Sequence, residues 1–499
     1  MTRPRVAVAS GNALGAEAAG EVARSGGNAV DACLAASVMA WVAEPCFASV
    51  TGAGFVAVHE PSGGVVVYDG NCCMPRRPPQ SWGQGVSRIY LDYSQGMYTG
   101  IGGGSVAVPG VLAAVHRAWE RHGSIEWAAL FEPAIRVAKK GLPLPRTCDY
   151  YLKQTWQLWS RYDSALALFA GPSGDPLEEN DLLVQAELAE ALEWMAQQGP
   201  EVLYGGDLGR ELAAAVAADG GLVTVEDLAS YKPVARTPLA TEAFGWTIRT
   251  NPPPAVGGAV LVHMLGLIDD IDTEDPLARL TAIVAAEETA VSYRELHYAD
   301  PADIAAALSG ALAPAGPQRS SETTHSSAAD EDGLACALTQ SNGYGAGLIV
   351  HGIVLNNTLG EEELNPLGTH RLPGGARCHS NMAPTIARGP GVVAALGSPG
   401  GDRITGAIAQ TIMALALDDA ALAEAVAAPR AHVARRPEGK LLCYEPGLPG
   451  AELNGDYVPR PYDEIHMFFG GVQASSVTED GRVDAAHDPR RSGASLLVS

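Results

Sequence analysis

The sequence is poor in positive charge. Its 499 residues include 33 Lys and Arg against 57 Asp and Glu, which gives a formal net charge of −24 and a pI near 4.8. A protein this acidic repels polyanions, so neither nucleic acid nor an anionic membrane surface is expected as a partner. The acidic excess itself is typical of a well-solvated surface.

Signals for a membrane, a metal or a dinucleotide are also missing. The most apolar stretch, 32–43, is far shorter than the roughly 18 residues of a membrane span, so it predicts a buried helix. The first twenty residues lack the apolar core of a signal peptide, which predicts a cytoplasmic protein. No HExxH or similar ligand spacing occurs, so neither a metal nor another cofactor is expected. The glycine run 102–104 lacks GxGxxG spacing, which argues against dinucleotide binding.

Cysteine is present but never in CxxC spacing. The eight cysteines lie at positions 33, 46, 72, 73, 148, 336, 378 and 443. Without close pairs, a zinc ribbon or a redox motif is not expected. Several of them sit in apolar runs, so they are predicted to be reduced, buried small side chains.

Hydrophobic periodicity divides the chain at a Pro/Ala/Ser-rich linker, 311–321. Before it we expect strands at 5–9, 54–60, 64–69, 237–243 and 246–250, and helices at 13–25, 29–42, 111–122, 127–140, 181–198, 207–218, 256–268 and 277–297. After it we expect strands at 323–329, 334–339, 348–355, 385–386, 392–397, 465–469 and 472–477, and helices at 404–417 and 422–427. Helices bracketed by strands predict a layered α/β architecture.

The strand after the linker begins with a threonine pair, Thr323-Thr324. The Thr323 hydroxyl could attack the carbonyl of Glu322, and an N-to-O acyl shift followed by hydrolysis would free Thr323 as a new N-terminus. Its α-amine, with an ordinary pKa of about 8, would then act as base for its own hydroxyl. A threonine pair is also a common structural feature of strands, because β-branched residues suit a pleated sheet.

A series of short motifs accompanies this pair along nearly the whole chain. In order they are Gly26-Gly27-Asn28-Ala29-Val30-Asp31-Ala32, Glu44-Pro45, Thr51-Gly52-Ala53-Gly54-Phe55, Ser105-Val106-Ala107-Val108-Pro109-Gly110, Glu132-Pro133-Ala134-Ile135, Asn251-Pro252-Pro253-Pro254, Thr323-Thr324-His325, Leu355-Asn356-Asn357, Met382-Ala383-Pro384-Thr385, Gly397-Ser398-Pro399-Gly400-Gly401, Ala428-Pro429-Arg430 and Asp488-Pro489-Arg490. Together they resemble the gamma-glutamyltransferase family of N-terminal-nucleophile hydrolases.

The resemblance implies an α+β fold, a four-layer αββα sandwich. It also implies that the precursor cuts itself into a large chain, 1–322, and a small chain, 323–499, which stay together in one fold. The expected partners are thus the two chains of one precursor and a small amide or amino-acid-like substrate. A homodimer of the processed unit is the other partner considered.

The resemblance carries over to four catalytic positions. Thr323 is the expected nucleophile, and Ser341 stands where the family has a second threonine that hydrogen-bonds the nucleophile. Gly400 and Gly401 match the oxyanion hole, where successive backbone N–H groups converge on the developing charge. Two alternatives stay open, since Ser341 is also simply a polar strand end and Pro-Gly-Gly is a common turn. His325 is expected to be structural.

The substrate pocket departs from the family pattern. Asn71 stands in place of the arginine that grips a substrate carboxylate, so a charge-assisted contact is lost. Glu361 replaces an aspartate that holds the substrate amine, although a run of three glutamates is equally a solvated turn. Ser380 and Asn381 replace a pair of serines. The short interval between positions 357 and 380 lacks a lid loop, which predicts an open pocket.

Three functions follow from these motifs. The first is a self-processing amidohydrolase or acyltransferase of the glutathione-metabolism type with an altered carboxylate pocket. The second keeps the nucleophile but hydrolyses a C–C bond of a dihydropyrrole amino acid in specialised-metabolite (antibiotic) biosynthesis. The third is an unprocessed homologue that only binds a ligand. The sequence does not name the acyl group.

Overall fold

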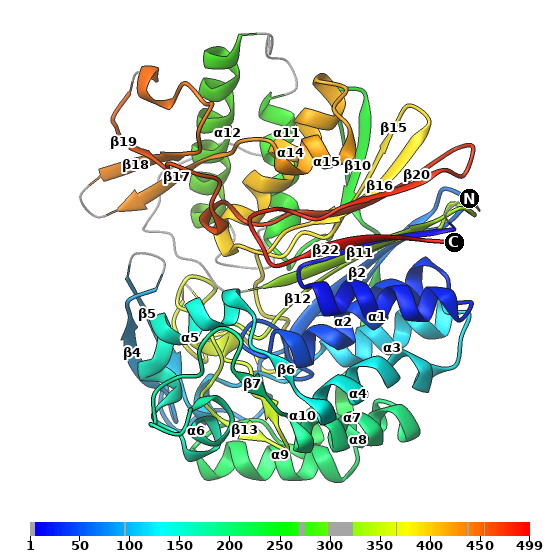
Figure 1. Ribbon diagram of the computed structural model, residues 1–499. Helices are drawn as coiled ribbons and strands as arrows, with labels where there is room; N and C mark the ends of the chain where they lie inside the picture. The colour runs from blue at the N-terminus through cyan, green and yellow to red at the C-terminus, as the bar shows by residue number, and fades with distance from the viewer. Residues whose placement is uncertain are drawn as a thin grey trace.

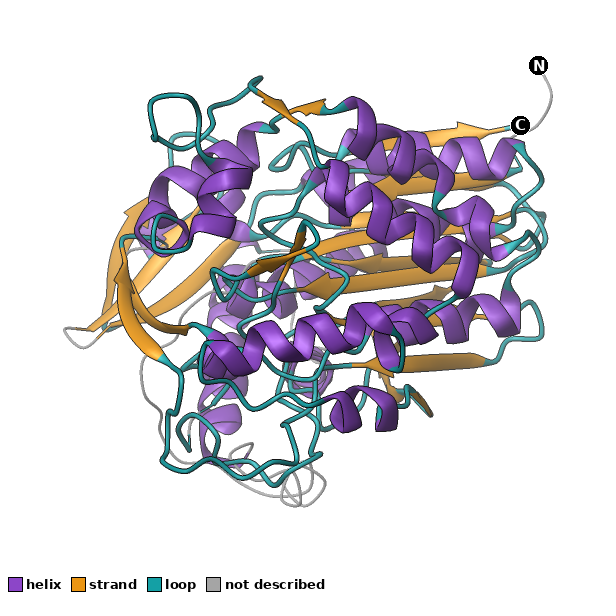
Figure 2. Ribbon diagram, turned by 90° about the horizontal axis from the view of Figure 1, so that it is seen from below, coloured by secondary structure: helices purple, strands orange, loops and turns teal. Residues whose placement is uncertain are grey.

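Two antiparallel sheets face each other, and helices cover both outer faces (Figure 1). This arrangement comes from a computed structural model that describes residues 5–93, 96–268, 275–297, 323–365, 367–436, 439–453 and 455–499. Seen from below, helices lie across the strands of the sheet behind them (Figure 2). The four-layer αββα sandwich expected from the sequence is therefore confirmed.

The first sheet contains strands from both ends of the chain and from its middle. Its order is β22-β1-β11-β12-β2-β3-β8. The bounds are β22 Ala494–Val498, β1 Val6–Ser10, β11 Thr324–Asp330, β12 Ala335–Ser341, β2 Ala53–His59, β3 Val65–Gly70 and β8 Val234–Arg236. Strand β11 pairs with β1 on one side and with β12 on the other, so the strand that follows Thr323 lies inside the sheet.

The second sheet has the order β21-β20-β16-β15-β10-β9. Its strands are β21 Val483–Ala486, β20 Gln473–Thr478, β16 Val392–Gly397, β15 Thr385–Gly389, β10 Trp246–Thr250 and β9 Leu239–Ala243. The core between the sheets is made mostly of small side chains, such as Ala57, Ala337 and Ala395. Small residues let the two sheets approach closely over their whole length.

Apolar helices complete the two outer layers. The first sheet is covered by α1 Ala13–Arg24, α2 Ala29–Ala43 and α3 Val111–His122, and the second by α11 Gly257–Ile268, α12 Pro276–His297, α14 Ile404–Leu417 and α15 Leu422–Ala427. Every residue of α2 is buried, as its uniformly apolar sequence predicts. Asn28 begins this helix with a capping box, because its side chain accepts from the Asp31 N–H while Asp31 accepts from the Asn28 N–H.

Smaller elements surround the sandwich. The helices are α4 Glu132–Lys140, α5 Arg146–Trp159, α6 Asp163–Phe169, α7 Ala186–Gln198, α8 Glu201–Tyr204, α9 Asp207–Ala218 and α10 Val225–Ser230. The strands are β4 Ser87–Leu91, β5 Met97–Ile101, β6 Leu142–Pro143, β7 Leu182–Leu183, β13 Ile349–Val350, β14 Ile353–Val354, β17 Ala431–Arg436, β18 Gly439–Tyr444 and β19 Tyr457–Pro461. They extend the fold without entering either large sheet.

Most predicted elements are present, and four predictions are wrong in part. The helix expected over 127–140 is broken into a 3-10 turn and α4, with Pro133 at the start of the second piece. The helix expected from 181 begins at 186, after the short strand β7. The strand expected over 348–355 is a two-stranded hairpin turning at His351-Gly352. The strand expected over 465–469 is a 3-10 turn. The linker 311–321 lies outside the described residues.

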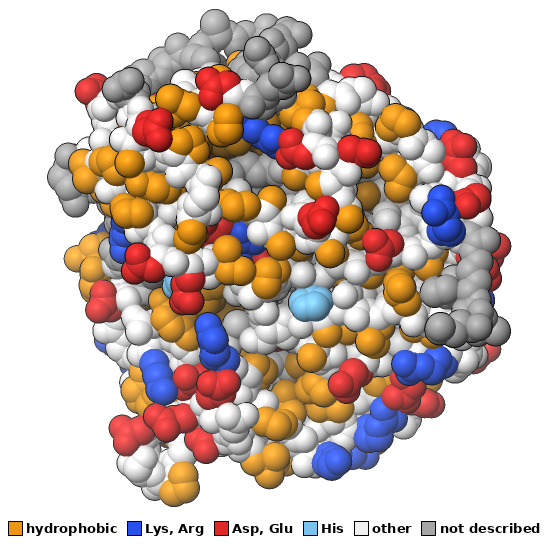
Figure 3. Space-filling model, turned by 45° about the horizontal axis from the view of Figure 1, so that its top comes forward, with side chains coloured by type: hydrophobic (Ala, Val, Ile, Leu, Met, Phe, Trp, Pro, Cys, Tyr) orange, Lys and Arg blue, Asp and Glu red, His pale blue; other side chains and the backbone are white. Residues whose placement is uncertain are grey.

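The distribution of charged side chains on the surface and the burial of the cysteines can be compared with what the sequence predicts. On the face drawn in Figure 3, acidic and basic side chains of the described residues are interspersed with apolar ones. Cys33, Cys46 and Cys336 are buried, as their apolar neighbours predict. Four of the other cysteines are buried too, and Cys73 is partly exposed. Of the helices in the described ranges, none is both long and apolar enough to cross a membrane.

Candidate active site

Three strand ends meet at one end of the sandwich, around Thr323. This residue directly precedes β11 and is only 2% exposed. Because β12 runs antiparallel to β11, its last residue, Ser341, returns to the same end. In the second sheet β16 ends at Gly397, and the chain continues into the Gly400-Gly401 turn. The end of β16 lies beside the start of β11, because a Cβ on Gly397 would come within 2.5 Å of the His325 ring.

A small buried cavity of about 10 Å³ lies at this point. Six predicted site residues line it together: Asn71, Thr323, Ser341, Glu361, Ser380 and Asn381. The remaining lining residues are Ala53, Thr358, Leu364, His379, Met382 and Ile404. All twelve are buried in this uncut chain. The open pocket expected from the short interval 357–380 stays a prediction. The volume corresponds to about one water molecule.

The glycine pair lies one turn away from this cavity. Gly400 and Gly401 have φ angles of 124° and 59°, a region that disfavours any residue with a Cβ. A Cβ on Gly400 would come within 3.0 Å of the Gly470 Cα. Neither glycine lines the cavity, but Ile404, the first residue of α14, does. Their role as an oxyanion hole stays a prediction.

Asn71 lies in the cavity wall, and its amide is largely used by the protein. The Asn71 Nδ2 donates to the Cys378 carbonyl, and the Oδ1 accepts from the Cys72 N–H at 2.9 Å. The Asn71 carbonyl accepts from the Tyr231 hydroxyl at 2.7 Å and from Arg377 at 2.6 Å. One amide hydrogen of Asn71 has no acceptor among the described residues. A substrate contact here is limited to neutral groups, namely that hydrogen and the second lone pair of the Oδ1.

Among the described residues that line this cavity there is no lysine or arginine. Arg76 is exposed and lies 3.8 Å from Asp227, and Arg77 is exposed as well. Arg377 lies 4.5 Å above the ring of Tyr231 and donates to the Lys232 carbonyl. These three arginines are thus engaged or exposed elsewhere, and none of them takes the place of the arginine that Asn71 replaces.

Glu361 is the charged residue of the cavity. It is 3% exposed, so it does not belong to a solvated turn, which was the alternative for this glutamate run. Its Oε1 lies 2.8 Å from the position that a Cβ on Gly343 would occupy, and Gly343 has a φ of 65°. The glycine therefore makes room for the carboxylate.

Ser380 and Asn381 differ in how far the protein satisfies them. The Ser380 Oγ accepts from the Met382 N–H at 3.2 Å. Asn381 is 6% exposed, and its Nδ2 has no hydrogen-bond partner among the described residues. A buried amide without a partner costs about 1–3 kcal/mol. Because Asn381 lines the cavity, a ligand carbonyl or hydroxyl there would remove that cost.

Comparison with known proteins identifies the family. The model of the family described as gamma-glutamyltranspeptidase matches residues 15–498. The chain belongs to the gamma-glutamyltranspeptidase family. It is therefore a gamma-glutamyltransferase-like enzyme of the N-terminal-nucleophile superfamily, a hydrolase or acyltransferase, as the motifs predicted.

Individual relatives of this gamma-glutamyltranspeptidase-family protein are distant but cover it fully. The glutathione hydrolase proenzyme of Escherichia coli (strain K12) is 28% identical, over 97% of this chain and 90% of that protein. The acylase ACY 1 proenzyme of Pseudomonas sp. (strain SE83) is 28% identical over 99% of this chain and 93% of its own. The crystal structure of cephalosporin acylase from Bacillus halodurans has a TM-score of 0.82 at 21% identity, covering 99% and 96% of the two chains. That last similarity supports the fold alone.

Two neighbouring asparagines of one family motif, Leu355-Asn356-Asn357, have structural roles that sequence reasoning did not foresee. The Asn356 Nδ2 donates to the carbonyls of Thr51 and Ala107, at 2.7 and 3.0 Å. The Asn357 Nδ2 donates to Thr99 Oγ1 and to the Gly100 carbonyl, at 3.1 and 3.0 Å. Each asparagine joins a loop near the cavity to chain that lies between 249 and 305 residues earlier. Asparagine signals only local turns in a sequence, so these long-range bonds gave no pattern to recognise.

The two histidines near the site behave differently. The His325 Nδ1 pairs with Thr339 Oγ1 at 2.8 Å, and complete burial lowers the pKa of His325 to about 3. A histidine that stays neutral and faces away from the cavity fits the expected structural role. His379 lines the cavity, and its Nδ1 lies 3.1 Å from the Leu364 carbonyl.

Proposed function

We propose that this protein is a self-processing N-terminal-threonine amidohydrolase or acyltransferase, with Thr323 as its nucleophile. The carrying observation is the convergence of Thr323, Ser341 and the four predicted pocket residues on one buried cavity. The relatives named above are a glutathione hydrolase proenzyme and acylases, and the word proenzyme is consistent with cleavage into two chains. In this protein the chains would be 1–322 and 323–499.

Self-cleavage would come first. The Thr323 hydroxyl attacks the carbonyl of residue 322, the C–N bond between the two residues breaks, and an ester forms as the Thr323 nitrogen becomes a free amine. Water then hydrolyses the ester, which leaves Glu322 with a carboxylate and restores the hydroxyl. Glu322 lies outside the described residues, and Thr323 directly precedes β11.

Catalysis would follow the same chemistry on a substrate. The freed α-amine takes the proton from the Thr323 Oγ, which attacks the substrate carbonyl, and the N–H groups of Gly400 and Gly401 stabilise the oxyanion. The leaving amine departs with that proton and an acyl-threonine ester remains. Water or an acceptor amine then takes the acyl group and frees the hydroxyl. Ser341 would hold the hydroxyl in line.

The pocket favours an acyl group that carries an amine. Any carboxylate of that acyl group would be bound by neutral side chains and not by an arginine. Glu361 offers a buried carboxylate for the amine, while Asn71, Ser380 and Asn381 offer neutral groups only. Glu361→Gln should raise the KM for an amine-bearing acyl donor about 10- to 100-fold with self-cleavage intact, since a charge-assisted hydrogen bond is worth roughly 1.5–3 kcal/mol. An unchanged KM would remove Glu361 from the substrate site.

The deciding experiment is a denaturing gel with intact mass and N-terminal sequencing of fresh protein. The 51.7 kDa chain should give fragments of ~33 and ~18 kDa, with threonine first in the smaller. Thr323→Ala should remain at full mass and inactive, whereas the matched variant Thr323→Ser keeps a hydroxyl and should still be cut. Turnover by Thr323→Ala would overturn the proposal. A wild-type chain that stays at full mass would indicate the unprocessed binding homologue.

The C–C bond alternative uses the same nucleophile. What favours it is the described part of the cavity lining, which holds no lysine or arginine to grip the carboxylate of a γ-glutamyl group. Parallel assays with γ-glutamyl-p-nitroanilide and an acylated dihydropyrrole amino acid separate the two reactions. Turnover of the first alone assigns an amidohydrolase, and turnover of the second alone assigns a C–C bond hydrolase.

A further inference from the structure

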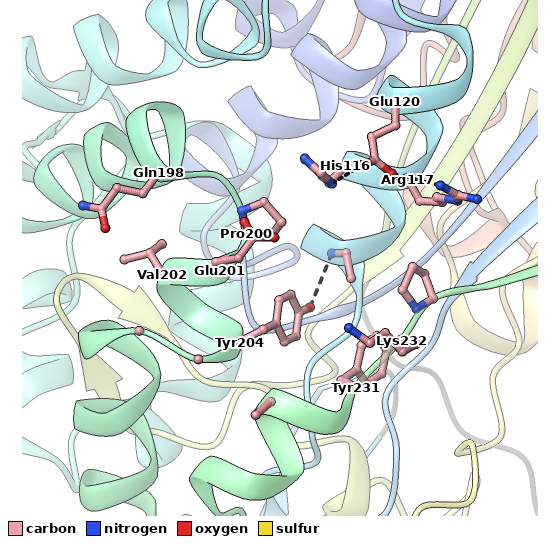
Figure 4. Close-up of a pocket in the computed structure, with 15 residues that line it drawn as sticks. His116, Arg117, Glu120, Gln198, Pro200, Glu201, Val202, Tyr204, Tyr231 and Lys232 are labelled. Atoms are coloured by element: carbon pink, nitrogen blue, oxygen red, sulfur yellow. Dashed lines mark hydrogen bonds and ion pairs between the residues drawn. The ribbon is translucent and has the colours of Figure 1, made fainter.

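A second and much larger cavity lies away from Thr323. It has a volume of about 800 Å³ and is bounded by α3, by the turn between α7 and α8, and by the chain that follows α10 (Figure 4). It shares no lining residue with the catalytic cavity. Its size is within the range of roughly 300–1,000 Å³ that is usual for small-molecule sites.

Two stacked tyrosines form one wall of this cavity. The rings of Tyr204 and Tyr231 are 5.5 Å apart and nearly parallel, at 15°. The Tyr204 hydroxyl donates to the Pro109 carbonyl at 3.2 Å, and the Tyr231 hydroxyl donates to the Asn71 carbonyl at 2.7 Å. Because both hydroxyls are fixed to backbone, the rings are held rigidly. Tyr204 is partly exposed, so its ring offers a preorganised apolar surface to a ligand.

Some of the charges around the cavity neutralise one another. Arg117 donates to Glu120 at 3.1 Å, and the His116 Nδ1 lies 3.8 Å from the same carboxylate. Burial lowers the pKa of His116, so the imidazole is neutral at pH 7. Lys232 and Glu201 are exposed and form no ion pair with any residue in the described ranges. In Figure 4 they lie on either side of Tyr204.

We propose that this cavity binds a zwitterion with an apolar side chain, namely a free amino acid or a short peptide. Lys232 would hold the carboxylate, Glu201 the ammonium, and the ring of Tyr204 the side chain. A ligand with one charge would use only half of this arrangement. A polyanion such as a nucleotide would meet one unpaired cation and two carboxylates, so it fits poorly.

The proposal concerns binding, and it stands whether or not Thr323 is the nucleophile. Calorimetric titration of the full protein with three ligands that share a phenyl ring tests it: L-phenylalanine, 2-phenylethylamine, which lacks the carboxylate, and 3-phenylpropionate, which lacks the amine. L-Phenylalanine should bind with a Kd on the order of 1 mM, as expected for a ligand of its size. Each analogue should bind about tenfold more weakly, because each loses one charge-assisted contact.

Two variants separate the two charges. Lys232→Ala should weaken L-phenylalanine and 3-phenylpropionate about tenfold and leave 2-phenylethylamine unchanged. Glu201→Ala should weaken L-phenylalanine and 2-phenylethylamine and leave 3-phenylpropionate unchanged. Lys139→Ala and Glu193→Ala are matched controls, since these two residues pair with each other outside the cavity and should change nothing.

Two results would overturn the site. The first is no saturable binding of L-phenylalanine up to about 10 mM, far above the expected Kd. The second is binding that neither Lys232→Ala nor Glu201→Ala weakens, which would locate the amino acid elsewhere. Both variants change exposed side chains, and near-native unfolding temperatures will show that they fold.

Discussion

The hydroxyl of Thr324, the residue after the proposed nucleophile, donates a hydrogen bond of 2.7 Å to the carboxylate of Glu44. The same Glu44 oxygen accepts from the Asn12 Nδ2 at 2.8 Å, and Asn12 in turn caps α1 by accepting from the Gly15 N–H at 2.6 Å. Glu44 follows the last residue of α2. One buried carboxylate therefore fixes the start of β11 to the ends of two helices.

Replacing Glu44 tests this junction through stability. Glu44→Ala leaves two buried donors without an acceptor, so the free energy of unfolding should fall by about 1–3 kcal/mol. Glu44→Gln keeps an acceptor oxygen and should lose much less. Self-cleavage should slow in Glu44→Ala, because Thr324 is no longer held. Urea unfolding in the uncut Thr323→Ala background keeps the comparison on one chain, and equal stability of the two variants would contradict the prediction.

The same residue predicts a pH dependence. Burial raises the pKa of Glu44 above 4.5, so in the folded protein the carboxyl holds its proton more tightly than in the unfolded chain. Its contribution to stability is then fully present below the unfolded pKa and is lost as pH rises through the folded pKa. Glu44→Gln should remove this fall. Unfolding measured from pH 4 upwards, with and without the substitution, checks the sign.

For His325 we expect the opposite dependence of stability on pH. Burial lowers the pKa of His325 from 6.5 to about 3, so the unfolded chain binds the proton more tightly than the folded protein does. Stability should therefore decrease as pH falls from 6.5 towards 3, by on the order of a few kcal/mol in total. His325→Gln should flatten this acid limb while costing stability at pH 7, because the ring packs on Gly397. An unchanged acid limb would show that other groups dominate it.

Alanine substitutions at two glycines with positive φ distinguish the loss of an oxyanion-hole donor from the cost of backbone strain alone. Gly400→Ala should lower kcat about 10²- to 10³-fold, the usual cost of losing an oxyanion-hole donor, since the turn must shift away from Gly470. Gly391 has a φ of 72° in the β15–β16 turn, with no atom within 4 Å of an added Cβ. Gly391→Ala should cost about 1–2 kcal/mol of stability and leave kcat unchanged. Similar kcat values for both variants would argue against the oxyanion hole.

Asn381 should behave unlike an ordinary buried polar residue. Its Nδ2 has no partner in the part of the chain that the structure describes, so Asn381→Ala removes an unsatisfied donor and should change the free energy of unfolding by less than about 1 kcal/mol. The KM should nevertheless rise, because the substrate loses that donor. Ser380→Ala is the comparison, since the Ser380 Oγ accepts from the Met382 N–H and its removal should cost stability. A strongly destabilised Asn381→Ala would show that the amide is satisfied in solution.

Strong local patterns predicted the helices well. The expected bounds of α3, α9, α14 and α15 are those observed, because each has clear periodicity and a definite end. Helix α5, rich in aromatic residues and Thr, and the small sheet β17–β19 were missed, since their sequences carry weak local preferences and tertiary packing decides their structure.

The candidate site was located by its motifs, and its internal contacts were not. The sequence placed Thr323, Ser341 and Glu361 in one site, and the structure puts all three at one cavity. The bond between Glu44 and Thr324 joins residues 280 positions apart, and no local pattern encodes it.

Strand β11 lies between β1 and β12, and this position affects whether the cleaved protein can refold. If the chain is cut before Thr323, the small chain owns β11 and the large chain owns β1, so the backbone ladder between them becomes the seam of two polypeptides. The pairing of β1 with β11 forms easily while the chain is continuous, because the two strands then belong to one molecule. After the cut the same ladder has to form between separate molecules, at a rate that depends on their concentration. Cleavage would therefore make unfolding hard to reverse. A cleaved enzyme whose two chains have unfolded and separated would not readily regain the native fold.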